Sequence, residues 1–368
     1  MVATTNLAIH STGAVEREIM RRRLDITALI MWIVGALLVV GIVWGSFNTL
    51  RAGVYSRSNW IDFTIFGLAQ GCLYALIALG YTLVYGILRM INFAHGEVFM
   101  AGAFTGFYVA TPLFASGFLT NYPVPGLLMV TAVAMATSIT VAYLLERICY
   151  RPLRNAPRLV PLITAIGASL FLQYTFAGLY GNDVQTYPDI PSLTGKWQIG
   201  GIGILKTQLV VIIAAVVLMA LLYVYVQYTK AGKAMRAVSE DKETAALMGI
   251  NVDATIVRTF VIGAALAGAA GVLYALLNKQ VQFYMGFQPG LKAFTAAVLG
   301  GIGNIPGAML GGISLGLIES LGPSLFLEGW KIPAPYQLKD AIAFTMLVLI
   351  LIFRPTGILG ERLARKKA

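Results

Sequence analysis

Charge is scarce in this chain. Asp, Glu, Lys and Arg make up 12% of its 368 residues, whereas soluble domains carry roughly 25%. The two cysteines, Cys72 and Cys149, lie on separate segments and suggest neither a disulfide nor a metal site. The two histidines, His10 and His95, are too isolated to form a metal cluster. We therefore expect no metal in the protein.

Motifs for enzymatic chemistry are missing as well. The sequence contains no Gly-x-x-x-x-Gly-Lys-Ser/Thr loop, which binds nucleotide phosphates through its backbone amides. It shows no Ser/His/Asp or paired-carboxylate arrangement, and no series of acidic residues for a proton relay within its apolar runs. We expect no catalytic residue and no cofactor. The energy for any process that the protein drives then comes from the flow of a solute down its gradient or from another protein.

Hydrophobic residues, in contrast, make up 58% of the chain. Several apolar runs approach the ~20 residues that a helix needs to cross a bilayer. The sequence therefore predicts an all-α fold, a polytopic transmembrane helical bundle. We expect eight full spans plus a broken or re-entrant helix pair, the full spans lying at 26–47, 63–84, 98–118, 127–145, 159–180, 208–228, 259–277 and 341–353.

The broken pair is predicted at 291–321, where a cluster of glycines and a proline interrupts the apolar run. One straight helix here would put the C-terminus on the wrong side of the membrane, whereas two half-helices that turn at the glycines, or two spans, would not. Unwound backbone of this kind lines transport pathways. The candidate pathway residues in this segment are Gly300, Gly301, Gly303 and Asn304.

The distribution of Lys and Arg predicts the orientation. Most of them fall before Asp25, at Arg89, in 147–158, in 229–258 or after Phe353, which places these segments in the cytoplasm. The loop 181–206, rich in glycine and proline, is then external and irregular. The span 26–47 follows a basic stretch and lacks a small-x-small cleavage site, as in an uncleaved anchor with a cytoplasmic N-terminus.

A polar stretch interrupts the apolar region between Phe63 and Tyr122, where the only Asp, Glu, His, Lys or Arg residues are Arg89, His95 and Glu97. A charge at a bilayer centre costs about 2.5–3.5 kcal/mol, so such residues usually face protein or water. We expect this kink either to lie on a transport pathway or to form a cytoplasmic turn. A third alternative is that its side chains brace the kink from within the subunit. The candidate pathway residues here are Asn92, His95 and Glu97.

The segment 229–258 alternates positive and negative side chains around an apolar side. Ser239 is a suitable N-cap for a helix that starts at Glu240, and Gly249 is a suitable end. We expect a short amphipathic helix that either lies on its own bundle or docks a partner subunit. The candidate docking residues are Glu240, Asp241, Glu243, Ala245, Ala246, Met248 and Gly249.

Two further patterns lie in the last third of the chain. Gly303, Gly307 and Gly311 are four residues apart, which favours close helix packing within lipid. Glu319 stands in an apolar run, and we expect it either to be paired or to reach solvent near the outer surface.

Four stretches together resemble one family. They are GYTLVYGILRMINFAHGEVFMAGAF, ERICYRPLR, AVSEDKETAALMGIN and LKAFTAAVLGGIGNIPGAMLGG, and they are similar to the H-type membrane permease of bacterial branched-chain amino acid ABC importers. The resemblance runs from Phe63 to Gly360. It implies a multi-pass permease of the inner membrane that moves leucine, isoleucine and valine from periplasm to cytoplasm. The alternatives are a permease for urea or short amides, or a stand-alone channel.

The resemblance also implies partners and parts. The partners are a second permease (identical or homologous), two cytoplasmic subunits that bind and hydrolyse ATP, and a periplasmic substrate-binding protein, with no nucleic acid. The parts are an extension with an extra helix at 1–60, a permease domain at 61–360 and a basic cytoplasmic tail at 361–368. Glu243-Thr244-Ala245-x-x-x-Gly249 resembles the Glu-Ala-Ala-x-x-x-Gly loop by which importer permeases contact ATPases, and it departs from that loop at Thr244.

Overall fold

A computed structural model describes residues 29–154, 156–157, 159–199, 202–354 and 356–360. The expectations for the N-terminal 25 residues and for the basic tail 361–368 fall outside these residues. The described chain forms two compact units. One consists of the residues up to Tyr55 together with Pro323–Gln337, and the other of Ser56–Gly322 together with the chain from Leu338.

The first unit contains a long apolar helix, Leu29–Ala52, which extends beyond the predicted span at 26–47. It packs on a π-helical turn, Pro323–Leu327, and a 3-10 turn, Glu328–Trp330. The indole Nε1 of Trp330 donates a hydrogen bond to the Gly41 carbonyl at 3.1 Å. Most of the large side chains along this helix are exposed, as expected of a helix that faces lipid.

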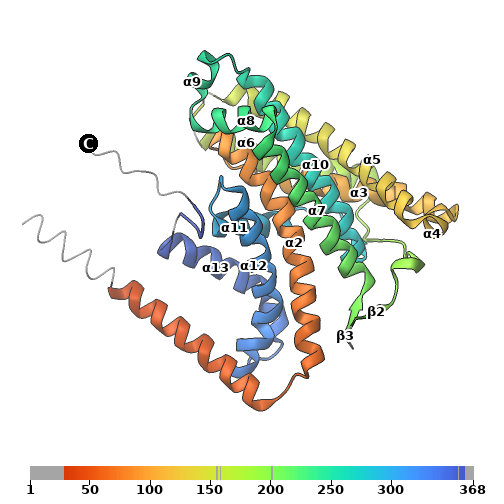
Figure 1. Ribbon diagram of the computed structural model, residues 1–368, viewed down its shortest axis with the longest axis vertical. Coiled ribbons are helices and arrows are strands. Elements are labelled where there is room, and N and C mark those ends of the chain that lie inside the picture. Colours follow the sequence, from red (N-terminus) through yellow and green to blue (C-terminus); the bar gives the residue numbers. More distant parts are fainter. Residues whose placement is uncertain (1–28, 155, 158, 200–201, 355, 361–368) are drawn as a thin grey trace, which may run out of the picture. The chain divides into compact units, whose positions relative to one another are not determined.

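The second unit is a helical bundle, shown in Figure 1. Its helices, in chain order, are α2 (Arg57–Leu88), α3 (His95–Ala115), α4 (Phe118–Asn121), α5 (Pro123–Leu144), α6 (Leu159–Tyr180), α7 (Lys206–Tyr228), α8 (Lys230–Glu240), α9 (Lys242–Leu247), α10 (Val252–Asn278), α11 (Phe287–Gly300), α12 (Ile305–Gly322) and α13 (Lys339–Phe353). A π-helical turn, Leu145–Tyr150, and 3-10 turns at Arg151–Leu153 and Pro191–Leu193 complete the helical part of this unit. A further 3-10 turn, Pro335–Leu338, contains the boundary between the two units in the sequence.

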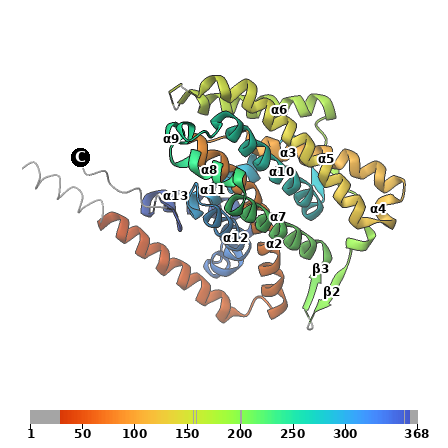
Figure 2. The same cartoon turned by 45° about the horizontal axis from the view of Figure 1, so that its top comes forward.

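Four short strands form two antiparallel pairs. β1 (Gln185–Thr186) pairs with β4 (Gln280–Val281), and β2 (Lys196–Ile199) forms a hairpin with β3 (Ile202–Leu205). In Figures 1 and 2 this hairpin lies at the end of the bundle opposite α8 and α9. That arrangement agrees with the opposite sides predicted for 181–206 and 229–258.

Nine helices in the described part of the chain are long and apolar enough to cross a membrane, so the polytopic helical bundle is confirmed. α2 begins at Arg57, ahead of the predicted start near Asp62, because the Ser56 hydroxyl accepts a hydrogen bond from the Asn59 amide and caps the helix there. The broken pair is also confirmed. α11 ends at Gly300, α12 begins at Ile305, and Gly301 and Gly303 turn the chain with φ values of 104° and 97°.

Glycines bring the helices of this bundle into backbone contact. A Cβ on Gly316 of α12 would overlap the backbone of Gly71 in α2, and a Cβ on Gly312 would overlap that of Ala75. Gly311 meets the backbone of α11 at Ala296 in the same way. The small residues of α12 therefore serve helix packing.

We predict that Gly316→Leu lowers the melting temperature of the purified protein, because overpacking a tight contact costs about 1–3 kcal/mol or more. The control is Gly178→Leu on α6, where no atom lies within 4 Å of an added Cβ. Thermal unfolding of both variants in the same detergent checks the prediction. Equal melting temperatures for the two variants would contradict it.

Candidate functional site

The polar kink is a sharp break between two helices. α2 ends at Leu88, its C-cap Arg89 takes the left-handed conformation with φ 57°, and α3 begins at His95 without a side-chain cap. Arg89 is exposed, but Asn92, His95 and Glu97 are each at most 3% exposed. The Tyr150 hydroxyl donates to Oδ1 of Asn92 at 2.5 Å. The three candidate residues therefore lie inside the protein, and only Arg89 reaches the surface.

Glu97 holds one oxygen in hydrogen bonds and leaves the other free. Its Oε1 accepts from Nε2 of Gln173 at 2.7 Å and from the Ser169 hydroxyl at 3.2 Å, and both donors lie on α6. Its Oε2 has no hydrogen-bond partner in the described structure. The position of Glu97 in the first turn of α3 favours a negative charge. No Lys, Arg or His forms an ion pair with it among the described residues.

His95 packs between α2 and its own helix. Its ring meets the Tyr81 ring edge-on, with the centroids 4.9 Å apart. A Cβ on Gly80 would overlap Nε2 of His95, so only glycine leaves room for the imidazole there. This geometry matches the alternative in which His95 braces the kink.

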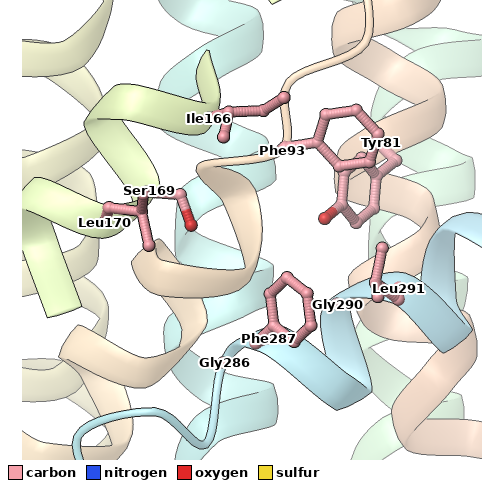
Figure 3. Close-up of a pocket in the computed structure, with 9 residues that line it drawn as sticks. All are labelled: Tyr81, Phe93, Ile166, Ser169, Leu170, Gly286, Phe287, Gly290 and Leu291. Carbon is pink, nitrogen blue, oxygen red and sulfur yellow. The ribbon is translucent and has the colours of Figure 1, made fainter. Parts of the chain in front are cut away.

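Two cavities are lined by the hydrogen-bond partners of Glu97, although Glu97 itself lines neither. The first, of about 200 Å³, is drawn in Figure 3 and is mostly apolar, its lining residues being Tyr81, Phe93, Ile166, Ser169, Leu170, Gly286, Phe287, Gly290 and Leu291. The second, of about 420 Å³, carries polar groups from Gln173, Gln280, Gln282, Gln288, Tyr274 and Tyr284. Leu170 and Phe287 line both. The two donors to Glu97 each face one cavity, since Ser169 lines the first and Gln173 the second.

The sequence analysis missed Ser169 and Gln173. Gln173 is a long polar side chain in the apolar run 159–180, and this was the available signal. Nothing in the sequence pairs these two residues with Glu97, which precedes them by about 70 positions.

The glycine turn lies elsewhere, against the last described residues. The Gly300 carbonyl accepts from the Leu359 amide at 3.0 Å, and Nδ2 of Asn304 donates to the Leu359 carbonyl at 3.0 Å. A Cβ on Gly301 would lie 2.5 Å from the Gly360 amide nitrogen. Gly300, Gly301, Gly303 and Asn304 do not line either of these two cavities. Their pathway role stays a prediction.

Glu319 is paired, as one of the two alternatives expected. Nζ of Lys292 lies 2.6 Å from Oε1 of Glu319 and 2.6 Å from Oδ1 of Asp340. Lys292 lies on α11, Glu319 on α12 and Asp340 on α13. The Lys292 and Glu319 side chains are at least nine-tenths buried. The pair satisfies charges that would be costly to bury alone.

The docking segment forms two helices and not one starting at Glu240. α8 ends at Glu240, and Asp241, rather than the expected Ser239, caps α9 by accepting from the amides of Glu243 and Thr244 at 2.9 and 3.0 Å. These bonds, with that from the Thr244 hydroxyl, lower the pKa of the Asp241 carboxyl. The Ser239 side chain bonds instead to the Arg236 carbonyl. Gly249, with φ 82°, follows the end of α9, near the expected place.

The apolar side chains of α9 divide into buried and exposed. Ala245 is 4% exposed and packs within its own chain, whereas Leu247 and Met248 are 88% and 79% exposed. The segment is tied to the bundle at both ends. Arg89 donates to the Ser239 carbonyl at 3.0 Å, and Arg151 pairs with Asp253 at 3.1 Å.

Comparison with known proteins identifies the family of the chain. Residues 63–351 match the family described as the permease component of the branched-chain amino acid transport system. The LivH high-affinity branched-chain amino acid transport system permease protein of Escherichia coli K12 is 43% identical over 300 residues, which cover 80% of this chain and 94% of that protein.

Two further relatives extend the comparison. The BraD permease protein of Pseudomonas aeruginosa is 43% identical over 308 residues, covering 82% of this chain and 96% of its own. A LivM branched-chain amino acid transport permease protein of Methanocaldococcus jannaschii is 28% identical over 145 residues, covering 36% of this chain and 41% of its own. By the family match and these identities, the chain belongs to the permease components of branched-chain amino acid transport systems.

Proposed function

We propose that this protein is the permease subunit of an ATP-driven importer that moves leucine, isoleucine and valine across the inner membrane into the cytoplasm. The observation that carries the proposal is its 43% identity, over 80% of its length, with a permease named for that transport. The bundle of membrane-spanning helices suits a permease. We further propose that two cytoplasmic ATP-binding subunits hydrolyse the ATP, and that a periplasmic protein delivers the substrate.

A second permease completes the proposed pathway. The relatives named above include both a LivH and a LivM permease protein, which supports a homologous and non-identical partner. We propose that 61–360 form the permease domain, since the family match lies within it, and that 1–60 form an extension with one extra span. Of the predicted pathway residues, Glu97 has the strongest support because two cavities adjoin its hydrogen-bond partners.

Contact with the ATPase is assigned to α9. Leu247 and Met248 are large apolar side chains that stand almost fully exposed at the end of this helix, where burial by a partner would be favourable. Glu240, Asp241, Glu243 and Gly249 are exposed around them and suit a polar rim. Ala245 is excluded from a direct contact by its own burial, and it supports α9 from below.

We expect single cysteines at Gln198 and Met248 to be labelled from opposite sides of the membrane. The two positions lie on the β2–β3 hairpin and just after α9, and both are exposed. In a background without Cys72 and Cys149, an impermeant maleimide applied to intact spheroplasts should label the first, and applied to inverted vesicles the second. Labelling of both from one side would overturn the orientation.

We expect Leu247→Asp to release the ATPase subunits, because a carboxylate cannot enter an apolar groove without losing its hydration. Leu247→Met keeps an apolar side chain of similar volume and serves as the matched control. Co-purification of the ATPase with the tagged permease, followed by ATP-dependent leucine uptake in proteoliposomes, measures the effect. Normal co-purification and uptake by Leu247→Asp would rule out this docking helix.

A further inference from the structure

Glu97 is a buried carboxylate without a cation. It is 1% exposed, one oxygen has no hydrogen-bond partner, and no basic side chain pairs with it in the described part of the chain. Burying such a group unpaired costs free energy. Two other buried carboxylates of spanning segments are each paired with a basic side chain: Glu319 has Lys292 at 2.6 Å, and Glu146 pairs with Arg154. Within the described chain, a lysine therefore neutralises the buried carboxylate of Glu319, whereas no basic side chain neutralises that of Glu97.

The free oxygen lies behind the wall of the first cavity. A Cβ built on Gly286 would sit 2.8 Å from Oε2 of Glu97, so the oxygen rests against Gly286, which lines that cavity. Ser169 lines the same cavity and bonds the other oxygen. In Figure 3 the Ser169 hydroxyl and the Tyr81 hydroxyl both point toward the space between α6 and α11. Glu97 itself does not line the cavity, but Ser169 and Gly286 line it, and both lie against the carboxylate.

The other residues that line the cavity indicate which further chemical groups a bound molecule would carry. Ile166, Leu170 and Phe287 present apolar surface to the first cavity, which suits an aliphatic group. The first turn of α11 lines both cavities through Phe287 and carries the positive end of the helix dipole, which favours a carboxylate. A molecule that suits all three features carries a positive group for Glu97, a negative group for the first turn of α11 and an aliphatic chain for the apolar wall. An aliphatic amino acid in its zwitterionic form has these three groups.

We propose that the cavity between α6 and α11 is a transit site for such an amino acid, in which Glu97 accepts the ammonium group. Ser169 and Gln173 hold the Glu97 carboxylate in place through their hydrogen bonds. Leu170 and Phe287, which line both cavities, separate the apolar cavity from the polar one. The aliphatic side chain lies against Ile166. This proposal rests on the proposed function. It adds to it that the transported amino acid is recognised within one permease subunit.

The first test uses Glu97→Gln in the full complex. The glutamine Oε1 still accepts from Ser169 and Gln173, so a merely bracing role predicts normal transport. The transit site predicts that maximal leucine uptake into proteoliposomes falls about tenfold or more, as expected when ~1.4 kcal/mol of ammonium binding is lost. Stimulation of ATP hydrolysis by the binding protein should persist, and Glu97→Asp, which keeps the charge, should transport faster than Glu97→Gln.

The second test measures the charge of the cavity without transport. In a background lacking Cys72 and Cys149, Ser169→Cys should react faster with an aminoethyl than with a sulfonatoethyl methanethiosulfonate. Glu97→Gln should remove that preference, and saturating leucine should slow the reaction. Tyr174→Cys is the matched control, because it lies on the same helix but on its exposed face, and its preference should not respond to Glu97→Gln.

The outcomes separate the two proposals. If the unaltered complex transports no branched-chain amino acid, the proposed function fails. If it transports normally and Glu97→Gln changes neither uptake nor the labelling preference at Ser169→Cys, only the transit site is overturned. If Glu97→Gln and Glu97→Asp both fail to assemble with the partners, the carboxylate of Glu97 is needed for assembly itself, and the transit site is again overturned.

Discussion

Backbone contact along α2 is the constraint on which the bundle depends. At Gly67 and Gly71 this helix meets the backbone of α12, and at Gly80 it meets both α10 and the His95 ring. Within lipid there is little hydrophobic gain in bringing two apolar helices together, so association depends on the van der Waals contact that small residues allow. This contact sets the distance between α2 and α12. At Gly80 the absence of a side chain leaves room for the His95 ring beside α2.

Polar groups inside the bundle are treated in two ways. Lys292 neutralises Glu319 and approaches Asp340, which ties α11, α12 and α13 together. Glu97 instead receives two neutral donors from α6 and keeps a free oxygen beside a cavity. In the first arrangement a lysine of the same chain neutralises the carboxylate, although Oε2 of Glu319 has no hydrogen-bond partner in the described structure. In the second no basic side chain of the described chain forms an ion pair with Glu97, and the proposed transit site makes use of this difference.

The cytoplasmic-facing segment proposed for the ATPase is joined physically to the kink. Arg89 is the left-handed residue that ends α2, and it also donates a hydrogen bond to the last turn of α8. Six residues after Arg89, α3 begins at His95, and Glu97 lies in its first turn. One hydrogen bond therefore links α8 to the chain segment that precedes Glu97. The six residues 89–94 separate α2 from α3, and the first of them, Arg89, contacts α8.

The sequence by itself determined the class and the approximate span positions, because apolar runs of bilayer length can satisfy their backbone only as helices. It also determined the turn between α11 and α12, since Gly301 and Gly303 adopt positive φ, and it marked Glu97 as exceptional by its isolation. Tertiary structure alone decided that Ser169 and Gln173 hold Glu97, that Lys292 pairs with Glu319, and that Asp241 rather than Ser239 caps α9. The reason is physical. Helix formation and membrane insertion follow from local composition, whereas the partner of a buried polar group depends on which helix faces meet across the bundle.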